Sequence, residues 1–418
     1  MKIAVMIGTR PEIIKTWSVI HEINQREDAS LILIHTGQHY DYEMSEAFFE
    51  DLSLEQPHHH LAVGSLPAVE QTTEIANRLA SLLQEENADI LLVQGDTNSC
   101  LGSAIAATLS GVPLGHIEAG CRSFDRTMPE EINRVVIDSV SNLLFAPSEI
   151  AYHNLLREGC DPRRVFLVGN TALDALNEGL NLLGDRTIDI ETPYCVATIH
   201  RAGNTDQKDR LAEILKGLSQ LPVRCIFPIH PRTQKMIDEF DLSHLVEKKN
   251  VDLVTPMGYL SFLNLMRHSD LVVTDSGGVQ EEAALLGKPT LTIRNNTEWP
   301  ETIWGGLNRL VSADSQKIKQ EAYHVLKMED TSHKPLYEGE AGKRIINSIL
   351  ASFNSGNLHY KSSNQAIKGY PMLSLKTKPE GLVVMSFDGD GKFVPTEDGN
   401  HYLVEEYVKL SPGGLGYK

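Results

Sequence analysis

The chain has 418 residues, 41% of them hydrophobic and 22% charged, and its formal net charge is −18 at pH 7. This length predicts two large domains, because a single hydrophobic core stops growing at about 250–300 residues. The acidic balance argues against a nucleic-acid partner, whose phosphates require a concentrated basic surface, and no apolar run approaches the roughly 20 residues of a membrane-spanning helix, so membrane insertion is not expected.

The N-terminal segment is expected to form a core strand rather than a signal peptide. Residues 1–8 are mostly apolar, but Arg10 and Glu12 interrupt the run too early for secretion. The cysteines are scattered and form no Cys-x-x-Cys pair: Cys100, Cys121, Cys160, Cys195 and Cys225. We therefore expect reduced cysteines and a cytoplasmic location.

Short apolar, β-branched runs alternate with helical patterns along most of the chain. Strands are expected at residues 2–7, 31–35, 90–94, 113–117, 143–146 and 165–168, and then at 194–199, 223–229, 251–254, 271–274 and 290–293. Continuous apolar strands separated by helices form parallel sheets that are covered on both faces. The pattern predicts an α/β protein with two doubly wound, Rossmann-like domains, 1–170 and 171–353, and a ligand site at the carboxyl ends of the strands.

The last part of the chain changes character. An amphipathic helix is expected over residues 340–353, either closing the second domain or crossing back to the first. Residues 354–418 are expected to form a linker and a small β-rich segment, with strand-like pieces at 382–385 and 402–404. Residues 388–391 resemble part of a calcium loop, but the later acidic ligands are not at the required spacing, so a tight turn is predicted.

The first strand ends in a motif suited to binding a diphosphate. Pro11 fits the first turn of a helix and Gly8 permits close approach of the backbone, so Arg10 is held beside a helix N-terminus. Lys15 follows five residues later. The alternative is that Arg10 forms a surface ion pair and Lys15 is a solvated helix residue.

Three carboxylates follow later strands of the first domain. Asp96 and Glu118 each come directly after a strand, and Glu130 opens the next helix. Strand ends that deliver two carboxylates to one rim crowd like charges and favour proton transfer. Each residue also has a structural alternative: Asp96 as a helix cap, Glu118 in an ion pair with Arg122, and Glu130 in a first turn that favours acids.

Histidines end two strands of the second domain. His200 precedes Arg201, and His230 follows the next strand. Such groups suit the stabilisation of a departing phosphate. No set of His, Asp and Glu shows the spacing of a metal centre, and residues 58–60, three histidines, are expected in a loop, so no metal is predicted.

The segment Thr274-Asp275-Ser276-Gly277-Gly278-Val279-Gln280-Glu281-Glu282 follows an apolar run. A glycine pair at a helix start leaves backbone N–H groups for a phosphate, with Ser276, Gly277 and Gly278 facing it and Glu282 in reach of ribose hydroxyls. The alternative is an ordinary strand–turn–helix connection with a Ser or Asp cap.

Together these motifs resemble the bacterial and archaeal UDP-N-acetylglucosamine 2-epimerases. The resemblance runs in collinear order from residue 1 to about residue 353 and is carried by GTRPEIIK, QGDTNS, HIEAGCRSFDRTMPEEINR, TIHR, PIHPR, TDSGGVQEEA and RNNTEWPE. It implies two Rossmann-like domains in the glycosyltransferase-B arrangement, with UDP held mainly by the second domain and the sugar facing the first. It also implies a homodimer and no cofactor, and the chain lacks the Gly-x-Gly-x-x-Gly fingerprint of a nicotinamide site.

The activity implied by the resemblance is inversion at C2 of UDP-GlcNAc, which gives UDP-ManNAc. UDP is eliminated, 2-acetamidoglucal forms, and UDP adds back after a proton returns to the other face of C2. The resemblance assigns the acid/base work to Asp96, Glu118 and Glu130, and it places His200 near the diphosphate.

The resemblance assigns the remaining site residues to substrate binding. Arg10, Lys15 and the helix start at Ser276 to Gly278 would neutralise charge on the departing UDP. Phe262 would lie against the uracil, Glu282 would bind the ribose, and His230 would lie in the cleft. Trp299 stands where many relatives carry Arg, which removes one positive charge near the cleft.

Several related activities stay open at this point. A hydrolysing member of the family would add water to the glucal and release ManNAc and UDP. Another relative acts on a UDP-diacetamido-uronic acid, although the Glu12 in Gly-Thr-Arg-Pro-Glu favours UDP-GlcNAc over that sugar. From other classes, a retaining glycosyltransferase or a nucleotide-sugar sensor would have no use for three carboxylates on one rim.

Overall fold

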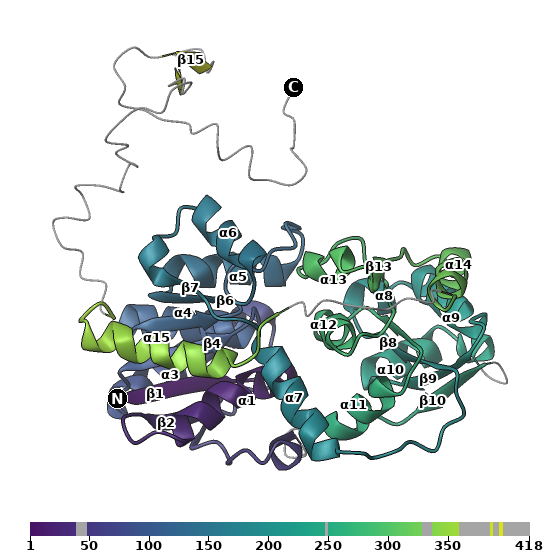
Figure 1. Cartoon of the computed structure of the whole chain (residues 1–418), viewed down its shortest axis with the longest axis horizontal. Coiled ribbons are helices and arrows are strands. Elements are labelled where there is room, and N and C mark those ends of the chain that lie inside the picture. The colour runs from purple at the N-terminus through teal and green to yellow at the C-terminus, as the bar shows by residue number, and fades with distance from the viewer. Residues whose placement is uncertain (39–47, 247–249, 328–336, 359–384, 388–392, 396–418) are drawn as a thin grey trace. The chain divides into compact units, whose positions relative to one another are not determined.

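The computed structural model describes residues 1–38, 48–246, 250–327, 337–358, 385–387 and 393–395. Residues 1–359 form one compact unit and residues 360–418 another, and each is described by itself. The first unit contains two parallel sheets with helices between successive strands (Figure 1).

The first sheet has seven strands in the order β3-β2-β1-β4-β5-β6-β7. The strands are β1 (Lys2–Ile7), β2 (Ser30–His35), β3 (His59–His60), β4 (Ile90–Gln94), β5 (Leu114–Ile117), β6 (Leu143–Ala146) and β7 (Val165–Leu167). Every neighbouring pair is parallel, and β1 aligns Ile3 with Leu31 on one side and Ile90 on the other. Parallel pairing requires burial of both faces, and the continuous apolar runs supply it.

The prediction of a loop at residues 58–60 is wrong for the last two residues, because His59–His60 forms the edge strand β3. It pairs with Ile34 and His35 of β2, and the ring of His58 accepts a hydrogen bond from the Leu33 N–H at 3.0 Å. A strand of this length is too short to show periodicity in the sequence.

Helical segments flank the first sheet, and two of the helices begin at side-chain caps. The segments are α1 (Arg10–Asn24), α3 (Ala68–Glu85), α4 (Asn98–Ser110), α5 (Pro129–Val140), α6 (Glu149–Arg157) and the 3-10 turn η1 (Pro162–Arg164). Thr97 caps α4 and Ser148 caps α6, each by accepting a hydrogen bond from a backbone N–H of the first turn. These caps place the helix starts directly behind the carboxyl ends of β4 and β6.

The second sheet has six strands in the order β10-β9-β8-β11-β12-β13. The strands are β8 (Tyr194–Thr198), β9 (Arg224–Pro228), β10 (Val251–Val254), β11 (Leu271–Thr274), β12 (Thr290–Thr292) and β13 (Asn308–Leu310). All pairs are parallel. The strand β13 was not predicted, because its short segment of mixed polarity gives no strand pattern.

The helices associated with the second sheet follow the same alternation. They are α7 (Thr171–Leu183), α8 (Ala202–Thr205), α9 (Lys208–Ser219), α10 (Pro231–Glu239), the 3-10 turn η2 (Ser243–Leu245), α11 (Tyr259–Arg267), α12 (Gly277–Leu285), α13 (Pro300–Trp304) and α14 (Ser315–Val325). With these elements, the prediction of two doubly wound sheets is confirmed; the domain boundary at residue 170 stays a prediction.

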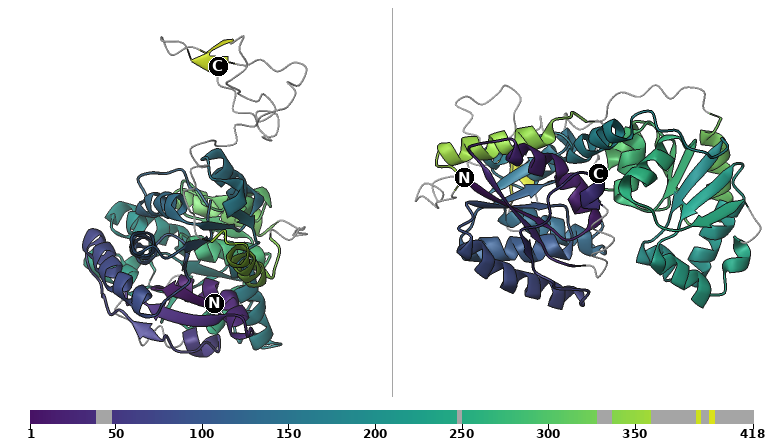
Figure 2. Two further views of the ribbon diagram at one scale, coloured as in Figure 1. Left: turned by 90° about the vertical axis from the view of Figure 1, so that its left-hand side faces the viewer. Right: turned by 90° about the horizontal axis from the view of Figure 1, so that it is seen from below.

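The helix α15 (Ala341–Asn354) crosses back to the first sheet, which resolves the alternative that the sequence left open. Its apolar face joins the core that contains Ile13 and Ile20 of α1, and a side chain at Gly342 would come within 2.5 Å of the Ser18 backbone. Asp174 accepts the Gly342 N–H at 3.0 Å and so ties the start of α15 to α7. Figures 1 and 2 show α15, in yellow-green, beside the helices of the first sheet.

In the second unit, β14 (Met385–Phe387) and β15 (Phe393–Pro395) form an antiparallel pair that aligns Phe387 with Phe393. A β-rich segment was predicted here, and of the strand-like piece 382–385 the described part is Met385. The piece 402–404, the turn at 388–391 and most of the linker lie outside the described residues.

Candidate active site

The start of α1 holds Arg10 at the carboxyl end of β1. The Glu12 carboxylate accepts hydrogen bonds from the N–H groups of Gly8 and Thr9, the latter at 2.9 Å, and burial raises its pKa. The Arg10 guanidinium lies 5.6 Å from the centre of the Phe48 ring. Because Glu12 already occupies these amides, an anion at this end of the sheet would interact with the charge of Arg10 rather than with the helix start.

Lys15 is buried between two carboxylates, so the alternative of a solvated helix residue is wrong. Its ammonium donates to Glu118 Oε2 at 2.6 Å, forms an ion pair with Glu281 Oε2 at 2.9 Å, and lies 4.9 Å from the centre of the Trp299 ring. Burial lowers the pKa of Lys15, but Glu118 and Glu281 outweigh this effect and raise it above its usual value. Lys15 is therefore a fixed positive charge next to a predicted acid/base residue.

Glu118 is held in an uncommon backbone conformation at the end of β5. Its φ angle is +72°, in the left-handed region that costs a non-glycine residue about 1–3 kcal/mol. The same Oε2 that contacts Lys15 also accepts a hydrogen bond from Gln94 Nε2 at 2.6 Å. The alternative pairing with Arg122 is wrong, because Arg122 pairs with Asp138 and Glu158.

Asp96 has a different cation. Its carboxylate pairs with the guanidinium of Arg134 on α5, and its backbone carbonyl accepts a hydrogen bond from Asn133 Nδ2 at 2.9 Å. The expected crowding of Asp96 against Glu118 is therefore replaced by separate ion pairs. Arg134 was not among the predicted site residues, although its position one turn after Glu130 on the same helix was a usable signal.

The two acids that open α5 have different roles. Glu131 is buried and accepts hydrogen bonds from the N–H groups of Ser123 and Phe124 and from Arg134 Nη1, the last at 2.9 Å. Glu130 is half-buried in the first turn. Since Glu131 holds the preceding loop, Glu130 is the acid of this pair that remains available for chemistry.

The second sheet presents its histidines on an anchored segment. Asp275 is fully buried and accepts the N–H groups of His200 and Arg201, at 3.1 and 3.0 Å. The His200 side chain is 40% exposed, and its ring centre lies 5.8 Å from that of His230. His230 caps α10 by accepting the Arg232 N–H at 3.2 Å. Asp275, which the sequence analysis placed in the phosphate motif, thus positions the strand end that carries His200.

The start of α12 has one closed glycine and one open glycine. Ser276 caps the helix by accepting the Val279 N–H. A Cβ on Gly277 would lie 2.4 Å from Glu298 Oε1, whereas a Cβ on Gly278 would meet no atom within 4 Å. The geometry of the Gly278 position therefore leaves room for a ligand at the helix N-terminus.

Three arginines surround the carboxylate beside this helix start. Burial raises the pKa of Glu298, but Arg294, Arg134 and Arg201 outweigh it and bring the pKa to about 2. Arg294 lies 2.7 Å from Glu298 Oε2. Because Arg134 also pairs with Asp96 and Glu131, Arg294 and Arg201 are the two guanidinium groups that outweigh the charge of Glu298 at the N-terminus of α12, which favours an anion.

Two adjacent acids on α12 are less well neutralised. Burial raises the pKa of Glu281 to about 7, with Lys15 acting in the opposite direction, and raises that of Glu282 to about 8. Glu281 is fully buried and Glu282 half-buried. Glu282 was a predicted site residue, whereas Glu281 was not.

The aromatic residues complete the surroundings. Phe262 on α11 is partly buried against the core beneath β8 and β9, so one part of its ring remains accessible. Trp299 is 1% exposed and packs against Tyr337 with ring centres 6.2 Å apart. Trp299, which stands where many relatives carry Arg, thus supplies an aromatic face to Lys15.

Within the described ranges, no group of three or more His, Cys, Asp and Glu side chains is arranged to hold a metal ion. All five cysteines are free thiols, and four of them are buried. None of the helices in the described part of the chain is long and apolar enough to cross a membrane.

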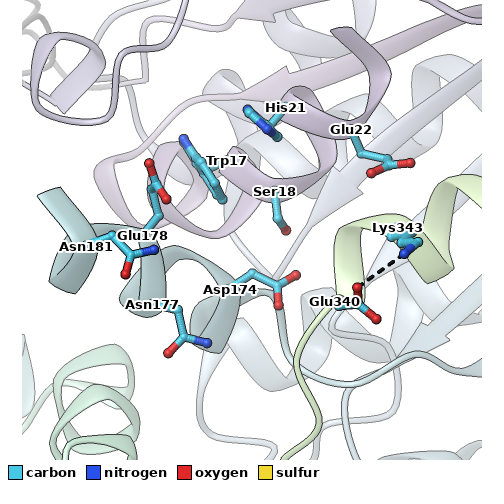
Figure 3. A pocket seen from close by; sticks show the side chains of 10 residues that line it. All are labelled: Trp17, Ser18, His21, Glu22, Asp174, Asn177, Glu178, Asn181, Glu340 and Lys343. Atoms are coloured by element: carbon cyan, nitrogen blue, oxygen red, sulfur yellow. Dashed lines mark hydrogen bonds and ion pairs between the residues drawn. The ribbon is translucent and has the colours of Figure 1, made fainter. Parts of the chain in front are cut away.

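A pocket of about 290 Å³ lies between α1, α7 and the start of α15 (Figure 3). Trp17 and His21 stack on one of its sides, with ring centres 5.0 Å apart, and Asp174 and Glu178 face them from α7. None of the site residues predicted from the sequence lines it. The pocket is therefore separate from the candidate active site.

Comparisons with known proteins agree with the geometry. A family model described as UDP-N-acetylglucosamine 2-epimerase matches residues 21–350. The UDP-N-acetylglucosamine 2-epimerase of Methanocaldococcus jannaschii is 41% identical over 359 residues, covering 83% of this chain and 98% of that protein. The UDP-2,3-diacetamido-2,3-dideoxy-D-glucuronate 2-epimerase of Pseudomonas aeruginosa is 38% identical over 352 residues, covering 82% of this chain and 98% of that protein.

A solved structure is also similar over most of the chain. The crystal structure of the M. jannaschii UDP-GlcNAc 2-epimerase in complex with UDP-GlcNAc and UDP superposes with a TM-score of 0.80 at 40% sequence identity, covering 84% of this chain and 100% of that chain. The predicted fold class, two Rossmann-like domains in the glycosyltransferase-B arrangement, is thereby confirmed.

Proposed function

The chain belongs to the UDP-N-acetylglucosamine 2-epimerase family, and from this premise we propose that it interconverts UDP-GlcNAc and UDP-ManNAc by inverting C2 of the sugar. The observation that carries the proposal is the contrast between two sets of groups: acids and Lys15 at the carboxyl end of the first sheet, and the N-terminus of α12 with Arg294 and Arg201 beside Glu298. No cofactor is needed for this reaction.

The reaction follows from the position of the proton. The C2 hydrogen is not next to a carbonyl group, so its removal alone would leave a poorly stabilised carbanion. When a carboxylate takes the proton while the C1–O bond breaks, the electron pair forms a C1=C2 double bond and UDP leaves with the bonding pair of the C1–O bond. A proton then returns to the opposite face of C2 as UDP adds back to C1, which restores all atoms.

The first-sheet carboxylates are proposed to move the proton. Glu118 is aimed by Lys15 and Gln94, Asp96 by Arg134, and Glu130 is the available member of its pair. Inversion requires a donor and an acceptor on opposite faces of C2, and separately held carboxylates can meet this requirement.

The second-sheet groups are proposed to hold UDP. The amides at Gly277 and Gly278, the Ser276 hydroxyl and the charge of Arg10 would stabilise the diphosphate as negative charge grows on it. His200 would lie beside the diphosphate and His230 in the cleft, while Phe262 would stack on the uracil and Glu282 would bind the ribose hydroxyls. Lys15 acts through Glu118 in this proposal, because its ammonium is already shared by two carboxylates.

The test is to incubate the protein with UDP-GlcNAc in D₂O and follow C2 by NMR. The proposal expects deuterium at C2 of the recovered sugar and accumulation of UDP-ManNAc. Free ManNAc and UDP would instead identify the hydrolysing reaction, and an unlabelled C2 in all products would contradict the proposal.

A second substrate deserves the same test because of one observation. The P. aeruginosa UDP-2,3-diacetamido-2,3-dideoxy-D-glucuronate 2-epimerase is nearly as similar to the chain as the M. jannaschii protein. This sugar differs by an acetamido group at C3 and a carboxylate at C6, both outside the atoms that react. Faster exchange with that sugar than with UDP-GlcNAc would reassign the substrate and leave the mechanism unchanged.

A homodimer is proposed through the outer face of α5. Ile132, Val136 and Val140 repeat at helical spacing and are 44%, 38% and 36% exposed, and Leu109 on the neighbouring α4 is 83% exposed. Exposed apolar side chains repeating along one helix favour burial against a second copy. Sedimentation should show a dimer for the natural chain and a monomer for Val136→Glu; an unchanged dimer would exclude this face. The cytoplasmic location stays a prediction.

A further inference from the structure

Glu281 is a buried acid that forms an ion pair between a helix of the second sheet and a helix of the first sheet. It lies on α12, whose N-terminus carries the proposed diphosphate site, and its side chain has no exposed surface. Its Oε2 forms the ion pair with Lys15 of α1 at 2.9 Å, and its Oε1 accepts a hydrogen bond from Asn170 Nδ2. Asn170 in turn accepts the Ala172 N–H at 2.8 Å and so begins α7.

Lys15 therefore connects Glu281 to Glu118 across the site. One ammonium serves two carboxylates, at 2.6 Å from Glu118 and 2.9 Å from Glu281. Both Lys15 and Glu281 are buried, so neither charge is compensated by bulk water. Glu118, Lys15 and Glu281 thus form one network of ion pairs, although they lie far apart in the sequence.

This arrangement has a consequence for proton transfer. When Glu118 accepts the C2 proton it becomes neutral and stops compensating Lys15. An ammonium left alone in a buried site would be strongly unfavourable, and the proton transfer would carry that cost. Glu281 removes the cost, because Lys15 keeps one carboxylate partner before and after the proton moves.

We propose that Glu281 is a positioning residue of the epimerisation: it holds Lys15 and remains its counter-charge while Glu118 alternates between its ionised and neutral forms. The inference rests on the proposed function of Glu118. It gives a fully buried acid outside the acid/base set a defined task, and it links the nucleotide-binding helix to the carboxylate that works on the sugar.

The ionisation of Glu281 then controls activity. Protonated Glu281 leaves Lys15 to Glu118 alone, which makes Glu118 a weaker base, so activity falls as the pH drops through about 7, the pKa of Glu281. The titratable and charged groups that face Glu281 are Lys15 on α1, Glu118 after β5, Cys121 in the following turn, Glu282 on α12 and Tyr337 before α15.

The central experiment compares the natural chain with Glu281→Gln, which keeps the size of the side chain and an oxygen that can accept from Asn170 but removes the charge and the second acceptor that faces Lys15. At saturating UDP-GlcNAc, C2 exchange in Glu281→Gln is expected to fall roughly 10- to 100-fold in kcat, with KM within about threefold. The decline of the natural chain between pH 8 and pH 6 is expected to be absent from the variant. A kcat within about twofold of the natural value with the same pH profile would overturn the inference.

A double-mutant cycle separates positioning from a general structural effect. If Glu281 acts through Lys15, adding Glu281→Gln to Lys15→Met should change kcat by less than about twofold. If Glu281→Gln lowered kcat as much in the Lys15→Met background as in the natural chain, the inference would be overturned. Glu282→Gln is the matched neighbour control, for which the larger effect is expected in KM rather than in kcat.

A second variant keeps the inference testable if Glu281→Gln does not fold. Asn170→Asp keeps the cap on Ala172 but places another carboxylate against Glu281, which makes Glu281 harder to ionise. The activity step is expected to move to higher pH, and an unmoved step would overturn the inference. A natural chain that shows no C2 exchange with either sugar would instead contradict the proposed function.

Discussion

The carboxyl ends of the two sheets differ in how their charges are satisfied. Behind the first sheet, Asp96 and Glu118 each have a buried cation as partner, so their positions are fixed before any ligand arrives. On the second sheet, the His200 side chain is 40% exposed, and a Cβ added at Gly278 would contact no neighbouring side chain or distant backbone within 4 Å. Proton transfer needs preorganised charge, whereas a nucleotide site must leave its donors available for the ligand.

The strongest way to break this comparison is to remove the charge of Glu118. Glu118→Gln is expected to lower C2 exchange by about 10²–10⁴-fold, the range typical of general acid–base groups, because the amide cannot accept the proton. UDP affinity, measured by calorimetry, should stay within about threefold, since the second sheet holds the nucleotide. Exchange at the natural rate would remove Glu118 from the mechanism.

The second sheet is tested by the two glycines of α12. Gly277→Ala forces a Cβ against the Glu298 carboxylate, which Arg294 holds in place, so a loss of about 1–3 kcal/mol in the free energy of unfolding is expected. Gly278→Ala meets no protein atom and is expected to leave the free energy of unfolding within about 1 kcal/mol.

The same pair locates the diphosphate. If UDP occupies the space beside Gly278, Gly278→Ala should weaken UDP binding by roughly tenfold although the protein is as stable as before. Unfolding in urea and calorimetry with UDP measure the two effects separately. Natural UDP affinity in Gly278→Ala would move the diphosphate away from this helix start.

A smaller effect is expected from pH. The pKa of Glu282 is raised from an ordinary value of 4.5 to about 8, and within the described ranges no ion pair involves this residue. Between these pH values the folded chain keeps a proton that the unfolded chain has lost, so stability falls as pH rises, by at most roughly 1.4 kcal/mol per pH unit.

Glu282→Gln removes this proton and should flatten the decline in urea midpoints between pH 6 and pH 8. The remaining slope would belong to Glu281, whose pKa is also raised. If the urea midpoints of the natural chain and of Glu282→Gln declined in parallel, Glu282 would not titrate between pH 6 and pH 8. Glu282 would then be ionised like the acids of the first sheet, and the two sheets would no longer differ in this respect.

The sequence was sufficient for the parts of the molecule that depend on local pattern. Apolar runs predicted the central strands of both sheets, because a buried parallel strand is apolar along its whole length. They missed β3 and β13, which are too short or too polar to show periodicity. The sequence left open which domain α15 packs against, because its apolar face could cover either sheet. The close approach of Gly342 to Ser18, which places α15 on α1, is visible only in the structure.

The candidate site was predictable as a set of strand ends but not as a set of charges. Motifs pointed to Asp96, Glu118 and the start of α12. They did not show that Lys15 and Glu281 meet, because this contact joins segments far apart in the chain and depends on how α1 packs against α12. The burial of Trp299 was missed for the same reason.

The most direct test is a crystal structure of Glu118→Gln with UDP-GlcNAc, which should trap the substrate before the proton moves. We expect the diphosphate at the amides of Gly277 and Gly278 and C2 of the sugar within hydrogen-bond reach of residue 118. A sugar that turns away from both Asp96 and residue 118 would contradict the proposed mechanism.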